Sequence, residues 1–203
     1  MQSENETLPG FDAIVNYLAH CHRAVLDTLN LNYPGSQPSL APGKRLGAVA
    51  EPDTAMLMEL AAQTMALART DMAGLVALVG GRLRYANRIR LAGGVVSAAS
   101  SAGLLAVITQ GLSHAALYMA LLAFLGSVSV LVAQHYENSS AGGSSLNAIQ
   151  MRLGNLQREL AELEGQYRLI EVTNDYSQLH DTVKRLNKVA AGLSEILVIY
   201  PAE

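Results

Sequence analysis

Charged residues are scarce in this sequence, and tryptophan is absent. Charged side chains account for 15% of the 203 residues, whereas they make up roughly a quarter of an average soluble domain. Half of the residues are hydrophobic, and the mean hydropathy is positive at +0.22. An ordinary core does not account for this balance, so we expect part of the chain to be shielded from water in another way.

Other absences exclude several classes of protein. The single cysteine, Cys21, excludes an internal disulfide. A formal net charge of -3 gives no overall basic field, so nucleic acid is not an expected partner. The start of the chain contains Glu4 and Glu6 and no apolar run, so we do not expect a cleavable secretory signal.

Patterns typical of catalysis and metal binding are also missing. His20, Cys21 and His22 are consecutive, and neighbouring helix positions point about 100° apart, so these side chains cannot converge on one metal ion without unwinding. Gly43 and Lys44 lack the surrounding spacing of a phosphate-binding loop. We therefore predict that the chain is not an enzyme and has no catalytic, cofactor-binding or metal-binding residues.

Two long runs without charge dominate the middle of the chain. Residues 91–110 and 115–134 contain no charged side chain and are separated by a short polar break. Each run is long enough to cross a bilayer, and the short break requires them to be antiparallel. The pattern predicts a transmembrane helical hairpin over residues 91–134, and the alternative is a buried hairpin in a soluble helical bundle.

Arginines set the predicted topology. Four of them precede the first run, Arg152 and Arg158 follow the second, and the turn has none. The positive-inside rule then places both termini in the cytoplasm, with two spans across the membrane. The four-residue cluster either fixes topology and meets anionic lipid headgroups, or also anchors a cytosolic partner. Its members are Arg82, Arg84, Arg88 and Arg90.

Small residues gather on one face of the first run. Such residues let helix backbones approach closely in membranes, so we predict a packing face. It either packs against the second run of the same hairpin, or forms a contact between subunits or a pore lining. The face consists of Gly93, Ser97 and Ser101, with Gly94, Ala98 and Ala102 beside them.

Further segments flank the hairpin. Residues 1–45 combine an amphipathic helix over residues 11–31 with a linker rich in proline and glycine. Residues 46–90 contain a helix that begins near Asp53 and runs to about Gly80, followed by the arginine cluster. We predict a flexible joint over residues 135–145 and cytosolic helices over residues 146–203.

The region of residues 146–203 has a pattern typical of coiled coils. Apolar residues recur in steps of three and four, and the pattern lapses near residues 173–177 before it resumes out of phase. A stutter within one helix or a turn between two helices would each produce this lapse. We expect the seam both to pair with another subunit and to pack on the helix of residues 53–80. Its first part is Leu146, Ile149, Leu153, Leu156, Leu160, Leu163, Tyr167 and Ile170.

This layout resembles that of the bacterial families of SMODS- and SLOG-associating two-transmembrane effectors (SLATT-like). The similarity lies in the basic lead-in from Arg82 to Arg90, the two spans with a minimal turn, and the helical tail that ends at Pro201, about 120 residues in all. The resemblance implies an oligomeric inner-membrane effector that permeabilises the membrane on activation, in anti-phage defence, with a cytosolic sensor or signalling protein as partner. Residues 1–75 lie outside it, so the trigger is not implied.

The hairpin and heptads are also similar to those of secreted bacterial proteins that insert into host membranes. This resemblance implies an alternative function, a membrane scaffold that does not permeabilise the bilayer and presents its coiled coil to a partner. A subunit of a larger transporter is a third interpretation. In each case we predict an all-α membrane protein with a two-helix transmembrane hairpin, cytosolic helices and a coiled-coil-like C-terminal region, bound to the lipid bilayer and forming a homo-oligomer.

Overall fold

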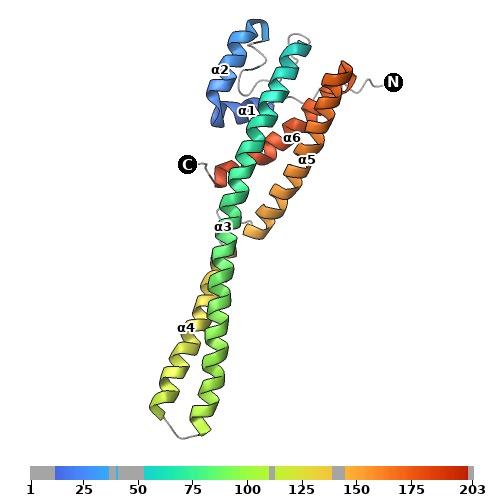
Figure 1. Cartoon of the computed structure of the whole chain (residues 1–203). Coiled ribbons are helices and arrows are strands. Elements are labelled where there is room, and N and C mark those ends of the chain that lie inside the picture. The colour runs from blue at the N-terminus through green and yellow to red at the C-terminus, as the bar shows by residue number, and fades with distance from the viewer. Residues whose placement is uncertain (1–11, 37–39, 41–52, 110–112, 139–144, 201–203) are drawn as a thin grey trace, which may run out of the picture. The chain divides into compact units, whose positions relative to one another are not determined.

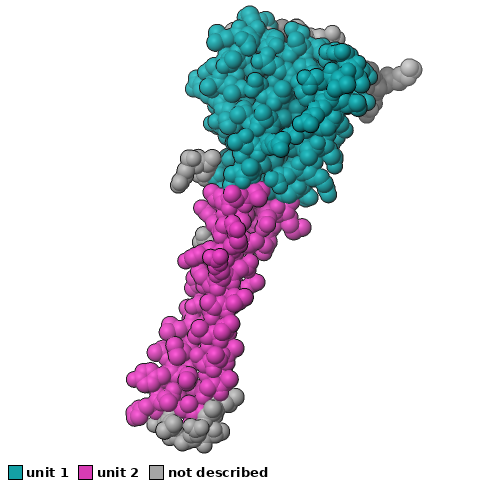
Figure 2. All heavy atoms as spheres, in the orientation of Figure 1, with its two compact units in different colours: residues 1–75, 152–203 teal, residues 76–151 magenta. Residues whose placement is uncertain are grey.

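The computed structural model describes residues 12–36, 40, 53–109, 113–138 and 145–200, without the side chains of residues 36, 105, 106, 108, 109, 113 and 136–138. These residues are almost entirely helical and include no strand (Figure 1), so the all-α prediction is confirmed. The chain divides into two compact units (Figure 2): unit 1 is Met1–Leu75 with Arg152–Glu203, and unit 2 is Val76–Met151. Both ends of the chain therefore contribute to unit 1.

Unit 1 is a helical assembly around an apolar core. Its core side chains include Leu18, Leu60, Leu153 and Leu186, one from each of four helices. The Ile14 N–H of α1 donates a hydrogen bond of 2.9 Å to the Asn187 side chain of α6. The elements of unit 1 are α1 (Asp12–Cys21), α2 (Arg23–Asn32), η1 (Pro34–Ser36), the start of α3 (Thr54–Thr109), most of α5 (Leu146–Thr173), η2 (Tyr176–Gln178) and α6 (Leu179–Ile199).

The N-terminal segment forms two helices where the sequence predicts one. α1 ends at Cys21, α2 begins at Arg23, and His22 between them has φ -138° and ψ 49°, outside the helical region. The single-helix prediction is wrong at this residue because the His22 ring bonds to Asp71, 49 residues away. Local periodicity does not register such a distant partner.

α3 is one uninterrupted helix where the sequence predicts an end near Gly80. The N-cap is the expected one, since the Asp53 carboxylate accepts the Ala55 N–H at 3.1 Å. No proline occurs between Pro52 and Pro201. Two adjacent glycines, Gly80 and Gly81, cost a helix about 1 kcal/mol each, which does not stop a helix that has strong helix formers on both sides.

The lapse in the C-terminal heptads is a turn between two helices. α5 ends at Thr173 and α6 begins at Leu179. Asn174 has a φ of 52°, a left-handed conformation that asparagine tolerates better than most residues. The Asp175 carboxylate accepts the Ser177 N–H at 3.1 Å, and hydrogen bonds from the side chain and then the backbone of Ser177 lower the pKa of Asp175. The alternative of a stutter within one helix is therefore excluded.

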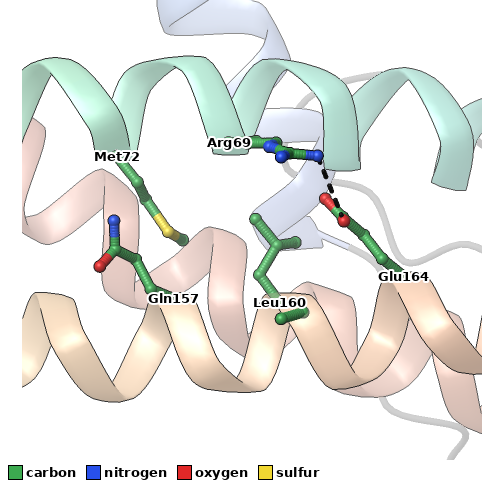
Figure 3. A pocket seen from close by; sticks show the side chains of 6 residues that line it. Arg69, Met72, Gln157, Leu160 and Glu164 are labelled. Atoms are coloured by element: carbon green, nitrogen blue, oxygen red, sulfur yellow. Dashed lines mark ion pairs between the residues drawn. The ribbon is translucent and has the colours of Figure 1, made fainter.

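The part of the heptad seam that belongs to unit 1, from Leu153 to Ile170, packs on other helices of that unit. Leu160 and Leu163 are buried, and the Tyr167 hydroxyl donates to the Met58 carbonyl oxygen of α3 at 3.2 Å. Figure 3 shows this face of α5 against α3, with the Arg69 guanidinium 3.5 Å from the Glu164 carboxylate. A helix from a second subunit would have to displace α3 or α6 to use the same seam, so pairing between subunits stays a prediction.

Two predicted irregular segments fall mainly on residues that the structure does not describe. The linker of residues 32–43 includes residues 37–39 and 41–43, and the joint of residues 135–145 includes residues 139–144, all outside the described part. At the end of the joint, the Ser145 hydroxyl accepts the Ala148 N–H at 3.2 Å and caps α5.

Candidate membrane hairpin

Unit 2 consists mainly of a hairpin between residues 76–109 of α3 and α4 (Ser113–Asn138), which lie side by side in Figure 1. The two backbones meet at a pair of glycines. A Cβ placed on Gly93 would lie 2.7 Å from the Gly126 carbonyl oxygen, and one placed on Gly126 would lie 2.7 Å from the Gly93 oxygen. No side chain fits at either position, so the helices are in backbone contact there.

Serine hydroxyls line the same interface and have hydrogen-bond partners. The Ser97 and Ser127 hydroxyls lie 3.0 Å apart across the hairpin. The Ser129 hydroxyl donates to the Leu125 carbonyl oxygen one turn earlier, at 2.9 Å. Because such bonds satisfy the hydroxyl groups, these serine side chains do not require water.

Large apolar side chains point away from the interface. Leu117 is 71% exposed and Phe124 is 63% exposed. A water-soluble hairpin places such residues inside and polar residues outside, and this hairpin has the reverse distribution. The large hydrophobic residues exposed on the described part of these two helices are Tyr85, Leu91, Val95, Val96, Leu117, Tyr118, Leu121, Leu122, Phe124, Leu125, Leu131 and Val132.

One helical segment in the described part of the chain is long and apolar enough to cross a membrane. It is His114–His135, 22 residues with a mean hydropathy of 2.2, of which 6% is buried. At 1.5 Å per residue it is about 33 Å long, close to the hydrocarbon thickness of a bilayer. The sequence predicts two spans, but the first reaches Gln110, outside the described residues, and several side chains before it are not described.

The predicted small-residue face is divided between two environments. Gly93 is buried and Ser97 reaches Ser127 of α4, which places these two in the hairpin interface. Ala98, Ser101 and Ala102 are exposed, and a Cβ added to Gly94 would meet nothing within 4 Å. Sequence reasoning missed Gly126 and Ser127, although a glycine beside a serine in an otherwise apolar run is a signal for close packing.

The arginine cluster lies on α3 within unit 2. All four side chains, Arg82, Arg84, Arg88 and Arg90, are exposed. Arg84 Nε donates to the Gly80 carbonyl oxygen one turn earlier, at 3.2 Å. The cluster therefore presents its charge to the surroundings of the helix rather than to its core.

A second polar cluster, in unit 1, joins the break after α1 to α3. Asp71 Oδ2 accepts the Tyr17 hydroxyl at 2.6 Å and lies 2.8 Å from His22 Nε2. Tyr17 is fully buried, and burial is the main reason that its pKa is raised, followed by the bond to Asp71. Sequence reasoning singled out His22 but missed Tyr17 and Asp71, because only the fold brings them together.

His20 and Cys21 do not join this cluster. With Ser194 and Leu197 they line a hollow of about 420 Å³ between α1 and α6. Burial raises the pKa of the Cys21 thiol, as does the nearby charge of Asp71. Among the described residues, no group of three or more histidine, cysteine, aspartate or glutamate side chains is arranged to hold a metal ion.

Comparison of the chain with protein-family models, with curated protein sequences and with solved structures gives no match.

Proposed function

We propose that the chain is an integral membrane protein whose unit 2 crosses a bilayer twice. The observation that carries this proposal is the inverted hairpin, with Gly93, Ser97 and Gly126 inside and side chains such as Leu117 and Phe124 outside. Lipid suits this distribution because apolar side chains need no cover there, whereas small residues allow close helix packing. The exposed His114–His135 segment, which corresponds to the predicted second span, is long and apolar enough to cross a bilayer.

The proposed topology has both termini in the cytoplasm. Four exposed arginines precede the predicted first span, and no lysine or arginine occurs between residues 91 and 151. Positively charged residues near a span are retained on the cytoplasmic side. The turn near His114 would then face the opposite side of the membrane, and unit 1 would be cytosolic.

The native cysteine provides a direct test of this topology. Cys21 is exposed and is the only cysteine, so it reports on the cytosolic side. We expect a membrane-impermeant maleimide to label Cys21 only after spheroplasts are lysed. We expect His114→Cys, in a Cys21→Ser background, to be labelled in intact spheroplasts. Recovery of the full-length chain as a monodisperse soluble particle without detergent would refute membrane insertion altogether.

The function that fits this hairpin best is that of an oligomeric effector that perturbs the inner membrane when activated. This is the role implied by the resemblance to the two-transmembrane effectors of anti-phage defence. Backbone contact at small residues holds the hairpin, and a second set of small residues, Gly94, Ala98 and Ala102, lies beside that contact without taking part in it. If helix contacts moved from the small residues inside the hairpin to those beside it, neighbouring hairpins could associate without exposing any charged side chain.

Membrane depolarisation tests the effector function. We expect induced expression, with phage challenge, to depolarise the membrane and arrest growth, as read with a voltage-sensitive dye. Leu125→Arg should abolish the effect because an arginine at the middle of a span costs roughly 3 kcal/mol. Leu31→Arg is the matched control, since Leu31 is an exposed leucine of α2 in unit 1. A membrane potential that stays normal while the protein is inserted would rule out the effector.

An exposed apolar group on unit 1 favours a second candidate, a scaffold that does not permeabilise the bilayer. Leu169 and Val172 on α5 and Tyr176 in η2 are exposed, and such groups serve as contacts for protein partners. A scaffold would insert, leave the potential unchanged, and lose a co-purifying partner on Val172→Asp. A secretion reporter fused to the N-terminus would separate a host-directed scaffold, which is exported, from a resident one.

A further inference from the structure

Charge is distributed unevenly between the two units. Unit 2 contains four arginines and one glutamate, a formal charge of +3, whereas the whole chain carries -3. No aspartate or glutamate occurs in residues 72–136. The arginine cluster therefore gives unit 2 a net positive charge, unlike the chain as a whole.

The four arginines surround their helix. At 100° per residue, they point at about 0° for Arg82, 200° for Arg84, 240° for Arg88 and 80° for Arg90. The buried Ala86, at about 40°, marks the packed side of the helix. Arg82 and Arg90 therefore border the packed side, while Arg84 and Arg88 lie on the opposite side.

This arrangement distinguishes between kinds of partner. A protein surface covers one side of a helix, so a site for a protein would gather its charges on one side. A layer of headgroups surrounds a helix that enters a bilayer, and phosphates are available in every direction. The cluster spans nine residues, about 12 Å along the axis, and long arginine side chains can reach from such a length of helix into a headgroup layer roughly 5 to 8 Å thick. The exposed aromatic ring of Tyr85 lies within it, as is common at this depth.

We propose that Arg82, Arg84, Arg88 and Arg90 form a collar that binds the phosphate groups of anionic phospholipids. The proposal rests on the membrane insertion of unit 2 and adds a specific lipid partner to it. Guanidinium groups donate paired hydrogen bonds to phosphate oxygens. Each basic residue near an anionic surface strengthens attachment about fivefold, and salt weakens the effect.

Lipid enrichment around the full-length protein tests the collar. The protein would be reconstituted in vesicles of phosphatidylcholine with a minor fraction of phosphatidylglycerol, extracted in polymer-bounded discs, and its co-purified lipid measured by mass spectrometry. We expect several-fold enrichment of phosphatidylglycerol over the vesicle composition, which decreases between 50 mM and 500 mM salt.

Three variants give the comparison its controls. Arg82→Gln, Arg84→Gln, Arg88→Gln and Arg90→Gln together should abolish the enrichment, and the same four positions changed to lysine should retain most of it. The matched control changes four exposed basic residues of unit 1, Arg158, Arg168, Lys184 and Lys188, to glutamine. It removes the same charge and should leave the enrichment intact.

The outcomes separate the collar from the insertion on which it rests. If the protein inserts into both lipids without enrichment, or if the glutamine variant is enriched as strongly as the parent, the collar is wrong and the hairpin stands. If a protein co-purifies through these arginines and no lipid is enriched, the partner of the arginine cluster is a protein and the lipid collar is wrong. If no variant floats with vesicles of either lipid, membrane insertion itself is wrong.

Discussion

Asp71 is the residue on which the N-terminal segment of unit 1 depends. One of its oxygens, Oδ2, serves both the Tyr17 hydroxyl and His22 Nε2, and the Tyr17 hydroxyl lies 3.2 Å from His22 Nε2. Three side chains from α1, the break and α3 therefore form one closed group. A change in any of them leaves a buried polar atom without its partner, which is more costly than the loss of an exposed bond.

Removal of the His22 ring should destabilise the chain. We expect His22→Ala to lower the free energy of unfolding by roughly 1 to 3 kcal/mol, because Asp71 loses a partner in a site that is 13% exposed. His20→Ala is the control, since the His20 ring bonds only the Asn16 carbonyl oxygen of its own helix among the contacts described. Thermal unfolding in detergent measures both, and equal midpoints would contradict a role for the cluster.

Alkaline pH should weaken the fold through Tyr17. Its pKa is raised above the ordinary value of 10, so the unfolded chain releases the phenolic proton first as the pH rises. Stability is therefore complete below pH 10 and falls above it, by up to about 1.4 kcal/mol per pH unit for one group.

The comparison of Tyr17→Phe with the parent isolates this contribution. We expect the variant to be less stable at pH 8 but to lose less stability between pH 9 and pH 11. Tyr85→Phe, which changes an exposed tyrosine, should follow the parent. The same slope in all three proteins would show that Tyr17 ionises as readily in the folded chain as in the unfolded one.

At the scale of the element, the α3–α4 pair depends on positions where nothing larger than hydrogen fits. We expect Gly93→Ala to separate the helices because its Cβ would meet backbone at 2.7 Å. Gly94→Ala is the matched control, with nothing within 4 Å, and should be neutral or stabilise α3 by about 0.5 to 1 kcal/mol.

A disulfide across the hairpin reports this separation. In a Cys21→Ser background, Ser97→Cys and Ser127→Cys should oxidise efficiently, since the two hydroxyls lie 3.0 Å apart. Gly93→Ala should reduce the yield of the disulfide and Gly94→Ala should not. Equal yields would mean that the glycine contact does not hold the hairpin.

Elements differ in how far the sequence predicts them. Strong periodicity predicts α5 and α6, and the absence of charge predicts α4, because each of these signals is local. The break at His22 depends on Asp71, and the packing of Gly93 depends on Gly126 in the next helix. The sequence therefore singles out His22 and Gly93, whereas their partners, Asp71 and Gly126, are identified only in the folded structure.

At the scale of the molecule, the two units have opposite surface character. Unit 1 buries leucines in a core, as soluble helical proteins do, and unit 2 exposes them. This difference explains why the composition of the whole chain is intermediate between the two classes. The composition predicts that part of the chain is shielded from water, the charge-free runs place that part at residues 91–134, and the exposed leucines of unit 2 lie in the same region.

Removal of unit 2 should convert the protein into a soluble one. We expect a chain in which residues 76–151 are replaced by a flexible linker of glycine and serine to remain in solution without detergent and to be helical by circular dichroism. The full chain, expressed alongside, should sediment with membranes and resist alkaline carbonate. A linker variant that still sediments with membranes would show that unit 1 has its own affinity for lipid.

The inverted hairpin also bears on which changes the chain can tolerate over evolutionary time. In the proposed bilayer, outward positions such as Leu117 and Phe124 would meet only fluid hydrocarbon, so any apolar side chain would serve there and natural variants should exchange them freely. Gly93 and Gly126 accept no alternative at all. Among homologous sequences, we therefore expect the bulky outward residues to vary and Gly93 and Gly126 to be conserved.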